Sequence, residues 1–329
     1  MNTLRKIAEN FNKNIKILYE EPMAEHTTFK VGGKADVFFE PHTIEELEQI
    51  TAYLKENSQS FFVLGGGSNL VVSDAGINCA VICTRSMNQI ELLPQEAQST
   101  DIKQSQQHGT LLLRCAAGTL MDDIAAFCEA NSISGLETFS GLPGTIGGAV
   151  YMNARCYERS ISDVLECVRW FNTSTGKTEL YSFNASDWAY KKSPFQHGGG
   201  IILEAVLKCK KGSSAEIKAE NAHYIEDRKN KGHFKFPSAG SVFKNNHDFG
   251  SPSGKIIDEA GLRGFSIGGA QVAPWHGNFI INTGNATAKD IHDLVLYITE
   301  TVKRKTGFEL EPEIIFTGTG FECSQNNKQ

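Results

Sequence analysis

Hydrophobic residues change their spacing along this chain in the way that a mixture of helices and strands requires. Leu47, Ile50 and Leu54 recur every three or four residues, which predicts a helix with one buried face. Thr43 and Glu46 stand where a capping box would begin that helix. Shorter apolar runs between turn-forming residues predict strands instead. The predicted strands are 15–22, 35–41, 61–64, 69–74, 78–85, 110–117, 164–173 and 200–211.

Capping residues mark further helices beyond one predicted over 3–12. These begin at Thr119 with Asp122 (apolar stripe Leu120, Ile124, Phe127), at Ser213 with Glu216, and at Thr287 with Asp290. The last of them ends at Gly307, a natural C-cap.

Breaks in the pattern predict three parts of the chain. The first α/β unit ends near residue 85, and Gly-Ser-Ser at 212–214 interrupts the strand pattern again. We therefore expect subdomains over 1–85 and 86–211 and a C-terminal domain over 212–329. Residues 95–108 are polar without a period, so an exposed hairpin tip or loop is expected there.

Composition narrows the class of protein. The 329 residues are 40% hydrophobic and 21% charged, as in an ordinary globular protein, with a net charge of −6 and a pI near 5.9. This charge argues against a nucleic-acid partner, although it leaves room for a local basic pocket. The N-terminus does not resemble a signal peptide, and no apolar window is long enough to span a membrane. We therefore expect no membrane insertion and a cytoplasmic location.

Cysteine and histidine usage supports the same location. The eight cysteines include no CxxC pair, so reduced, structural thiols are expected. Cys79 and Cys83 would lie on one face of a strand. The nine histidines show neither HxxxH nor HExxH spacing, so no protein-held metal is predicted.

Two glycine-rich stretches are the candidates for ligand binding. VLGGGSNLVVSDAG at 63–76 lacks the GK[ST] of a Walker loop and precedes a strand, whereas a dinucleotide fingerprint opens a helix. Its successive N–H groups suit a phosphate, but a tight turn between strands explains the glycines equally well. SGLPGTIGGAVYMNA at 140–154 would let backbone approach a flat ligand, or would let helices pack closely.

Longer motifs carry a family resemblance over nearly the whole chain. HTTFKVGGKADVFFEP (26–41), GLETFSGLPGTIGGAVYMNA (135–154), PSAGSVFKN (237–245) and LEPEIIF (310–316) resemble the UDP-N-acetylenolpyruvoylglucosamine reductase family in its order. The resemblance implies an α+β fold with a vanillyl-alcohol-oxidase-like FAD-binding region of two subdomains, followed by a C-terminal α/β substrate domain. It implies reduction of UDP-N-acetylglucosamine enolpyruvate to UDP-N-acetylmuramate by NADPH through FAD, a step of peptidoglycan precursor synthesis.

The resemblance also implies a set of cofactor residues. Non-covalent FAD is expected, because the loop at 65–69 has no His or Cys that would tether it. The implied FAD-binding residues are Thr28, Gly65, Gly66, Gly67, Ser68, Asn69, Gly141, Pro143, Gly144, Gly147, Gly148 and Ala149.

Three residues match the family's catalytic positions. Ser241 corresponds to the proton donor and Glu313 to the catalytic glutamate, whereas Lys191 stands where the family usually has an arginine that polarises the substrate carboxylate. Lysine keeps the charge but loses the two-pronged guanidinium, and the adjacent Lys192 is a competitor for the role. Arg155, in NARCYE where the family usually has NAGAYG, either compensates for that loss or is a surface residue.

The remaining implied roles concern the substrate and the alternatives. Tyr190, Arg228 and Asn245 resemble substrate-binding residues, and His276 lies in a matching segment without a catalytic role. The chain resembles the family's shorter subtype, which lacks a tyrosine-bearing insertion. Two other hypotheses remain: an oxidase of the same fold that uses oxygen, and a flavin- or UDP-sugar-binding protein with impaired turnover at Lys191.

Overall fold

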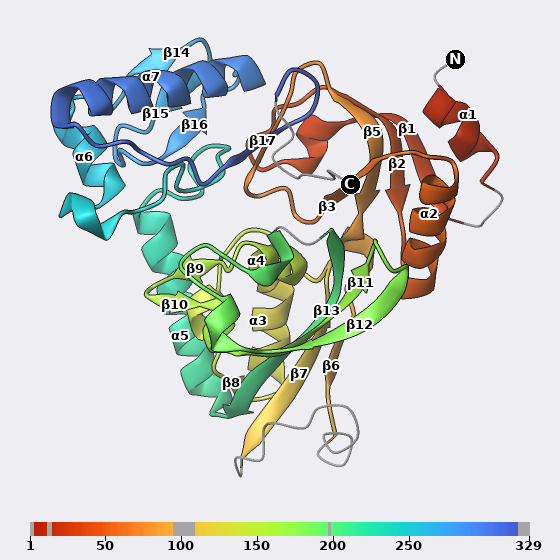
Figure 1. Cartoon of the computed structure of the whole chain (residues 1–329). Coiled ribbons are helices and arrows are strands. Elements are labelled where there is room, and N and C mark those ends of the chain that lie inside the picture. The colour runs from red at the N-terminus through yellow and green to blue at the C-terminus, as the bar shows by residue number, and fades with distance from the viewer. Residues whose placement is uncertain (1–2, 12–14, 95–108, 197–198, 322–329) are drawn as a thin grey trace.

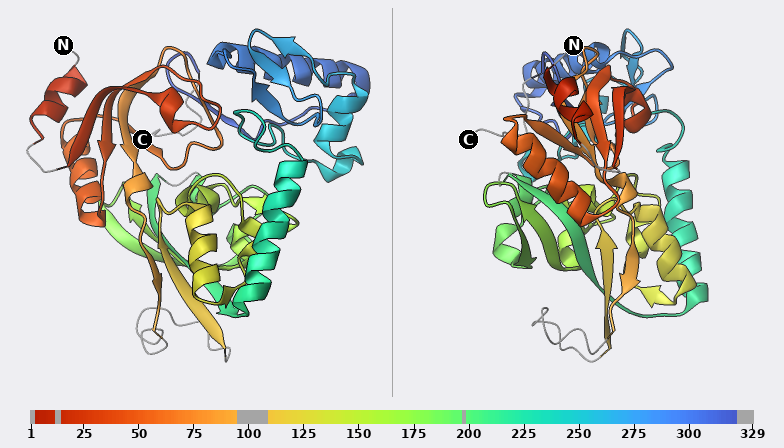
Figure 2. Two further views of the ribbon diagram at one scale, coloured as in Figure 1. Left: turned by 180° about the vertical axis from the view of Figure 1, so that it is seen from behind. Right: turned by 90° about the vertical axis from the view of Figure 1, so that its right-hand side faces the viewer.

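The computed structural model describes residues 3–11, 15–94, 109–196 and 199–321. The predicted loop at 95–108 and Cys323 therefore lie outside the described residues. Figures 1 and 2 show three parts, with the N-terminal and C-terminal parts both placed at one end of the middle one.

The N-terminal part is a four-stranded sheet in the order β1-β2-β5-β3 with two helices. Only β1 and β2 pair antiparallel; the other neighbours are parallel. Its elements are α1 (Thr3–Glu9), β1 (Lys16–Pro22), β2 (Lys34–Glu40), α2 (Ile44–Glu56), β3 (Phe61–Leu64), β4 (Leu70–Val72) and β5 (Ile77–Cys83). The predicted stripe of α2 is buried, and Thr43 Oγ1 accepts from the N–H of Glu46 as expected. The carboxylate of Glu46 accepts from the N–H of His42 and not from that of Thr43, so the predicted capping box is only half formed.

The middle part is an antiparallel sheet in the order β12-β11-β13-β7-β6, with β8 beside β13. Its strands are β6 (Ile90–Leu92), β7 (Thr110–Ala116), β8 (Ile133–Ser134), β11 (Leu165–Asn172), β12 (Lys177–Ser182) and β13 (Gly200–Lys211). The helices α3 (Met121–Ala130), α4 (Ile146–Tyr151) and α5 (Ser214–Asn230) gather beside one face of the sheet (Figure 2). Alternate residues of β13 face different cores: Ile202 packs with the helices, whereas Ile201 and Leu203 pack with the N-terminal part. One strand therefore joins the two subdomains through its two faces.

The C-terminal part packs two helices on a small sheet. Its elements are α6 (Ser253–Glu259), β14 (Ser266–Ile267), β15 (Ala270–Val272), β16 (Ile280–Asn282), α7 (Ala288–Thr306) and β17 (Ile315–Thr317). The capping box of Thr287 and Asp290 is confirmed, and Gly307 ends α7 in the left-handed region at φ 80°. After α7 the chain returns to the N-terminal part, where β17 pairs parallel with β4.

One predicted helix start was wrong, and one predicted capping hydrogen bond is not formed. α3 begins at Met121, because the hydroxyl of Thr119 donates to Gln89 O and the carboxylate of Asp122 accepts from the N–H of Gly141. Its buried stripe is accordingly Met121, Ile124 and Cys128. Ser213 is the N-cap of α5 by position, but its side chain makes no capping hydrogen bond.

The predicted domain boundaries at residues 85 and 212 stay predictions. The contacts of α5 are relevant to the boundary at residue 212. Ser214 Oγ donates to Glu129 O, and Asn221 accepts from Ser140 Oγ at 2.7 Å. These contacts hold α5 to the middle part, so a boundary after α5 fits the packing better than one before it. None of the described helices has the length and apolar character needed to cross a membrane.

Candidate active site

A cavity of about 1160 Å³ lies where the three parts meet. Its wall includes the loop 65–69 after β3, the stretch 142–149 leading into α4, the loop 238–241 of the C-terminal part, and Glu313 before β17. Both glycine-rich stretches, about 75 residues apart in the sequence, thus face one space. Their location selects ligand binding over a plain turn as the interpretation of the first stretch.

The first glycine loop is shaped by close backbone contacts. Gly67 has φ 62°, and a Cβ on it would lie 1.9 Å from His26 O, so no other residue fits there. A Cβ on Gly66 would lie 2.5 Å from the Cα of Gly144. The two glycine-rich stretches therefore pack backbone against backbone. A strand follows the loop, as predicted, and not the helix of the common phosphate loops.

The loop presents groups that need a ligand. Within the described residues, no protein acceptor is found for the backbone N–H groups of Gly66, Gly67 and Ser68. The buried hydroxyl of Thr28, which also lines the cavity, has no hydrogen-bond partner among the described residues. Buried polar groups are normally paired, and successive free N–H groups form an anion-binding concavity. These residues fit the pyrophosphate of FAD.

Ten of the twelve predicted cofactor residues line the cavity, and two do not. Gly141 (φ 70°) donates its N–H to Asp122 and packs near the stem of Arg228. Gly144 (φ 111°) lies against Ser68, because a Cβ on it would be 2.5 Å from Ser68 Oγ. We assign both glycines to loop packing, since neither reaches the cavity wall. The residues that line it are Thr28, Gly65, Gly66, Gly67, Ser68, Asn69, Pro143, Gly147, Gly148 and Ala149.

Gly148→Ala is expected to weaken FAD binding without weakening the fold. Gly148 lies in α4 and lines the cavity, and a Cβ on it would meet only Thr145 Oγ1, at 3.6 Å. Alanine favours the helix by about 0.5–1 kcal/mol, whereas overfilling a fitted site costs roughly 1–3 kcal/mol. Fluorescence titration of the apoprotein with FAD should therefore give a dissociation constant raised about tenfold.

The matched control is Gly66→Ala, whose Cβ would collide with backbone of the second glycine stretch. This variant should lower the thermal midpoint of the apoprotein itself. Equal FAD affinity in wild type and Gly148→Ala would contradict the assignment of α4 to the cofactor.

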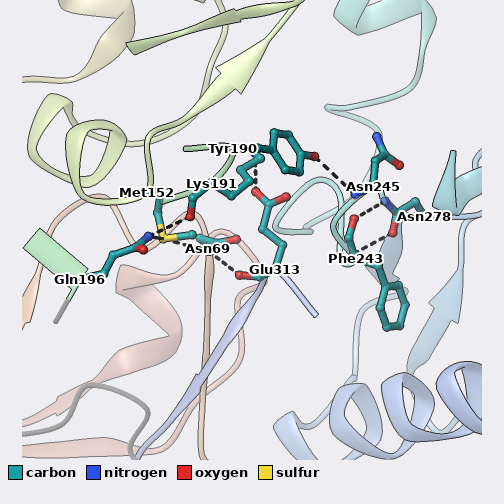
Figure 3. Close-up of polar contacts among 9 residues, drawn as sticks. All are labelled: Asn69, Met152, Tyr190, Lys191, Gln196, Phe243, Asn245, Asn278 and Glu313. Atoms are coloured by element: carbon teal, nitrogen blue, oxygen red, sulfur yellow. Dashed lines mark hydrogen bonds and ion pairs between the residues drawn. The ribbon is translucent and has the colours of Figure 1, made fainter. Parts of the chain in front are cut away.

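Lys191 and Glu313 form an ion pair in the cavity wall. Lys191 Nζ lies 2.6 Å from Glu313 Oε1, and each side chain is only 12% exposed (Figure 3). The backbone of Glu313 is fixed between two loops, because its N–H donates to Val242 O and its carbonyl accepts from Asn69 Nδ2. The return of β17 to β4 thus carries the carboxylate to the first glycine loop.

The backbone of Lys191 is held in an uncommon conformation. Its φ is 58°, in the left-handed region that favours glycine, and its carbonyl accepts from Gln196 Nε2 at 3.1 Å. Such strain persists where the surroundings determine it, commonly at functional sites. Lys192 is exposed and does not line the cavity, so the positions of the two lysines favour Lys191 for the predicted role.

Ser241 lies on a loop that Asn278 fixes. The amide of Asn278 accepts from Phe243 N and donates to Phe243 O, both at 2.8 Å (Figure 3). Val242 N–H donates to the carbonyl of the same asparagine at 2.9 Å. Ser241 is itself exposed and lines the cavity, as Lys191 and Glu313 do. The structure therefore brings together the three predicted catalytic residues from distant parts of the chain.

The predicted substrate residues divide into two groups. Asn245 and Arg228 line the cavity, and Arg228 is only 4% exposed, with Nε donating to Ser140 O and Nη2 without a hydrogen-bond partner among the described residues. Tyr190 is 39% exposed and is not in the cavity wall; its hydroxyl accepts from Asn245 N at 3.4 Å. Its position therefore suits holding the Asn245 loop better than direct contact with a ligand.

Sequence reasoning missed several lining residues. Tyr157, Lys231 and His233 line the cavity near Arg228. Burial is the main cause that lowers the pKa of His233 to about 4, so this imidazole is neutral at pH 7. The sequence offered one indication of a basic cluster here, because Lys231 follows Arg228 by three residues at the end of α5. In the described ranges no cluster of three or more His, Cys, Asp or Glu is placed to hold a metal ion.

Comparison with known proteins identifies the class first. Residues 35–181 match the model of an FAD binding domain, which agrees with the paired glycine stretches and their free N–H groups. The protein is an FAD-dependent oxidoreductase, and the predicted two-subdomain FAD-binding fold with a C-terminal domain is confirmed.

The particular family follows from the C-terminal part and from whole-chain relatives. Residues 231–317 match the C-terminal domain model of UDP-N-acetylenolpyruvoylglucosamine reductase. The reductase of Treponema denticola is 44% identical, with 92% of this chain and 94% of the relative covered; that of Borreliella burgdorferi is 40% identical, with 95% and 99% covered. The crystal structure of the reductase of Thermus caldophilus matches with a TM-score of 0.70 at 32% identity, covering 92% of this chain and 98% of that one. The chain belongs to the UDP-N-acetylenolpyruvoylglucosamine reductase family.

Proposed function

We propose that this cavity reduces UDP-N-acetylglucosamine enolpyruvate to UDP-N-acetylmuramate with NADPH as the reductant, in peptidoglycan precursor synthesis. The observation that carries the proposal is the meeting of Ser241, Lys191 and Glu313 at one cavity whose wall also includes residues of the two glycine stretches. A reduction of an alkene next to a carboxylate needs a hydride source, an anion-binding group and a proton donor in one place.

The glycine stretches hold the cofactor in this proposal. The N–H groups of Gly66, Gly67 and Ser68 bind its pyrophosphate, and the low-bulk surface of Gly147 and Gly148 accepts its extended body. FAD held there would supply the hydride chemistry that links NADPH to the alkene of the substrate. The loop 65–69 contains no His or Cys, so the binding is non-covalent.

Ser241 donates the proton. Hydride addition to the alkene places negative charge on the carbon beside the substrate carboxylate, and the hydroxyl of Ser241 is the exposed hydroxyl of the loop that Asn278 fixes. Asn278 fixes this loop through its backbone and makes no hydrogen bond to the hydroxyl of Ser241. The hydroxyl is therefore held in place by the loop and stays available as a proton donor.

Lys191, paired with Glu313, binds the substrate carboxylate and stabilises its charge. The ammonium of Lys191 is the cation that the carboxylate meets, and its pair with Glu313 orients it. A substrate carboxylate that pairs with this ammonium would lie beside the carboxyl group of Glu313, which places Glu313 next to the developing enolate.

Arg228, Lys231 and Asn245 bind the nucleotide end of the substrate. Arg228 offers an unpartnered, buried Nη2 to the cavity, the kind of donor that pairs with phosphate oxygens. The location is part of the proposal: we place the reaction in the cytoplasm, because all seven described cysteines are free thiols, as reducing compartments favour.

The test is a pair of half-reactions followed by flavin absorbance. The purified protein, reduced anaerobically with NADPH, should bleach, and addition of UDP-N-acetylglucosamine enolpyruvate should restore the oxidised spectrum. Recovery with oxygen but not with the enolpyruvate would instead indicate the oxidase alternative. Bleaching without recovery by either acceptor would indicate a binding protein whose turnover is impaired at Lys191.

A further inference from the structure

Arg155 lies on a tight hairpin at the edge of the cavity. The strands β9 (Arg155–Cys156) and β10 (Arg159–Ser160) pair antiparallel, and Arg155 is paired with Ser160. Only Tyr157 and Glu158 connect them, and both have positive φ, 47° and 64°. Non-glycine residues adopt this two-residue turn at a cost of about 1–3 kcal/mol each. A strained turn in the wall of a ligand cavity indicates that the position of the hairpin matters.

The hairpin borders the anion-binding side of the cavity. The guanidinium of Arg228 and the ammonium of Lys231 each lie 5.2 Å from the centre of the Tyr157 ring. Cys156, the strand neighbour of Arg155, is close enough to Arg228 and Lys191 for both to act on its thiol, although burial is the larger influence and raises its pKa. Arg155 therefore belongs to a wall that already gathers cations.

Among these cations Arg155 is the exposed one without a carboxylate partner, whereas Arg228, which also forms no ion pair within the described residues, is buried. Lys191 is paired with Glu313 and Lys231 with Asp227, each at 2.6 Å. Within the described residues Arg155 makes no ion pair, and the hydrogen bond from its Nη1 to Ser160 Oγ is 3.5 Å long, at the limit for such a bond. His233 is neutral at pH 7 and adds no charge. A charged, exposed, cavity-lining guanidinium thus faces solvent where an anionic ligand would enter.

We propose that Arg155 binds a phosphate group of the nucleotide substrates at the rim of this cavity. The inference rests on the proposed function, which supplies two phosphate-bearing substrates, the UDP-sugar and NADPH. A guanidinium suits this role, because its planar fork matches two phosphate oxygens. The hairpin fixes its backbone, so less freedom is lost when the ligand binds.

The experiment measures equilibrium binding and needs no turnover. UDP, NADP⁺ and NAD⁺ are titrated calorimetrically into the FAD-loaded wild type and into Arg155→Ala, Arg155→Lys and Arg159→Ala. Arg159→Ala is the matched control, because it removes the same charge from the same hairpin but Arg159 does not line the cavity. Thermal melts establish that each variant is folded, and Arg155→Lys serves if Arg155→Ala is not.

Arg155→Ala is expected to weaken binding of at least one phosphate ligand roughly 5- to 20-fold, the value of one partly exposed charge-assisted hydrogen bond. Arg155→Lys should show a smaller loss, and Arg159→Ala should match wild type. Weakened UDP binding locates the contact on the pyrophosphate of the UDP-sugar. Weakened NADP⁺ binding with unchanged NAD⁺ and UDP binding locates it on the 2′-phosphate.

Two results would overturn the inference: affinities of Arg155→Ala within twofold of wild type for all three ligands, or an equal loss in Arg159→Ala, which would reflect the general field of the hairpin. Either result leaves the proposed function standing. A wild-type protein that binds neither UDP nor NADP⁺ would contradict the proposed function instead.

Discussion

Ser241→Ala should leave flavin reduction by NADPH unchanged and slow flavin reoxidation by the enolpyruvyl substrate by roughly 10²- to 10⁴-fold, the range for loss of a positioned general acid. Ser241 lines the cavity but makes no side-chain contact that holds the loop, which Asn278 fixes through the backbone of Phe243. The substitution therefore removes a proton donor and little else. Anaerobic stopped-flow absorbance, with each half-reaction started separately, measures both rates.

Ser238→Ala is the matched control, because Ser238 lies on the same loop and also lines the cavity. Its reoxidation rate should stay within about twofold of wild type, since it is not aligned with a catalytic position. If Ser241→Ala reoxidises at the wild-type rate, the proton comes from another group or from water. If both half-reactions slow together, Ser241 acts on the binding of the cofactor.

Elements whose signals lie within a few residues were predicted well. The Thr43 cap of α2 and the Thr287–Asp290 box of α7 are local patterns, and both are present. The start of α3 was missed because Thr119 is used in a tertiary contact with Gln89, which no local pattern encodes. Likewise, nothing in residues 70–72 indicates that β4 pairs with a strand some 245 residues later.

In the candidate site, too, local motifs could be predicted from the sequence, whereas long-range contacts could not. Matching motifs pointed to Ser241 and Glu313, but their meeting at one cavity depends on the return of β17, which is a property of the fold. Gly141 and Gly144 looked like ligand-contacting glycines, but neither lines the cavity, and a Cβ on either would meet a side chain, of Arg228 or of Ser68. His233 gave no signal in the sequence, since a single histidine in a loop is ordinary; its role in the wall follows from burial.

Glu313→Gln should impair both the reaction and the ion pair on which the site is built. The glutamine keeps the size of the side chain and accepts a hydrogen bond from Lys191, but it leaves a charge that is 12% exposed without its counter-charge. We expect the free energy of unfolding to fall by about 1–3 kcal/mol, and reoxidation by the enolpyruvyl substrate to slow by roughly 10²-fold or more. Urea unfolding and the two stopped-flow half-reactions measure these effects.

The pairing itself is tested by a double-mutant cycle with Lys191→Met. Each single variant leaves one partner uncompensated, so the double variant should be more stable than the sum of the two losses predicts. Glu311→Gln is the control, because Glu311 is 70% exposed and pairs with Lys244 at the surface, where the loss should be below about 1 kcal/mol. Additive losses in the cycle would mean that the two side chains act independently. In that case Glu313 would not orient Lys191 toward the substrate carboxylate. The slower reoxidation of Glu313→Gln would then measure only the loss of the carboxyl group of Glu313 itself.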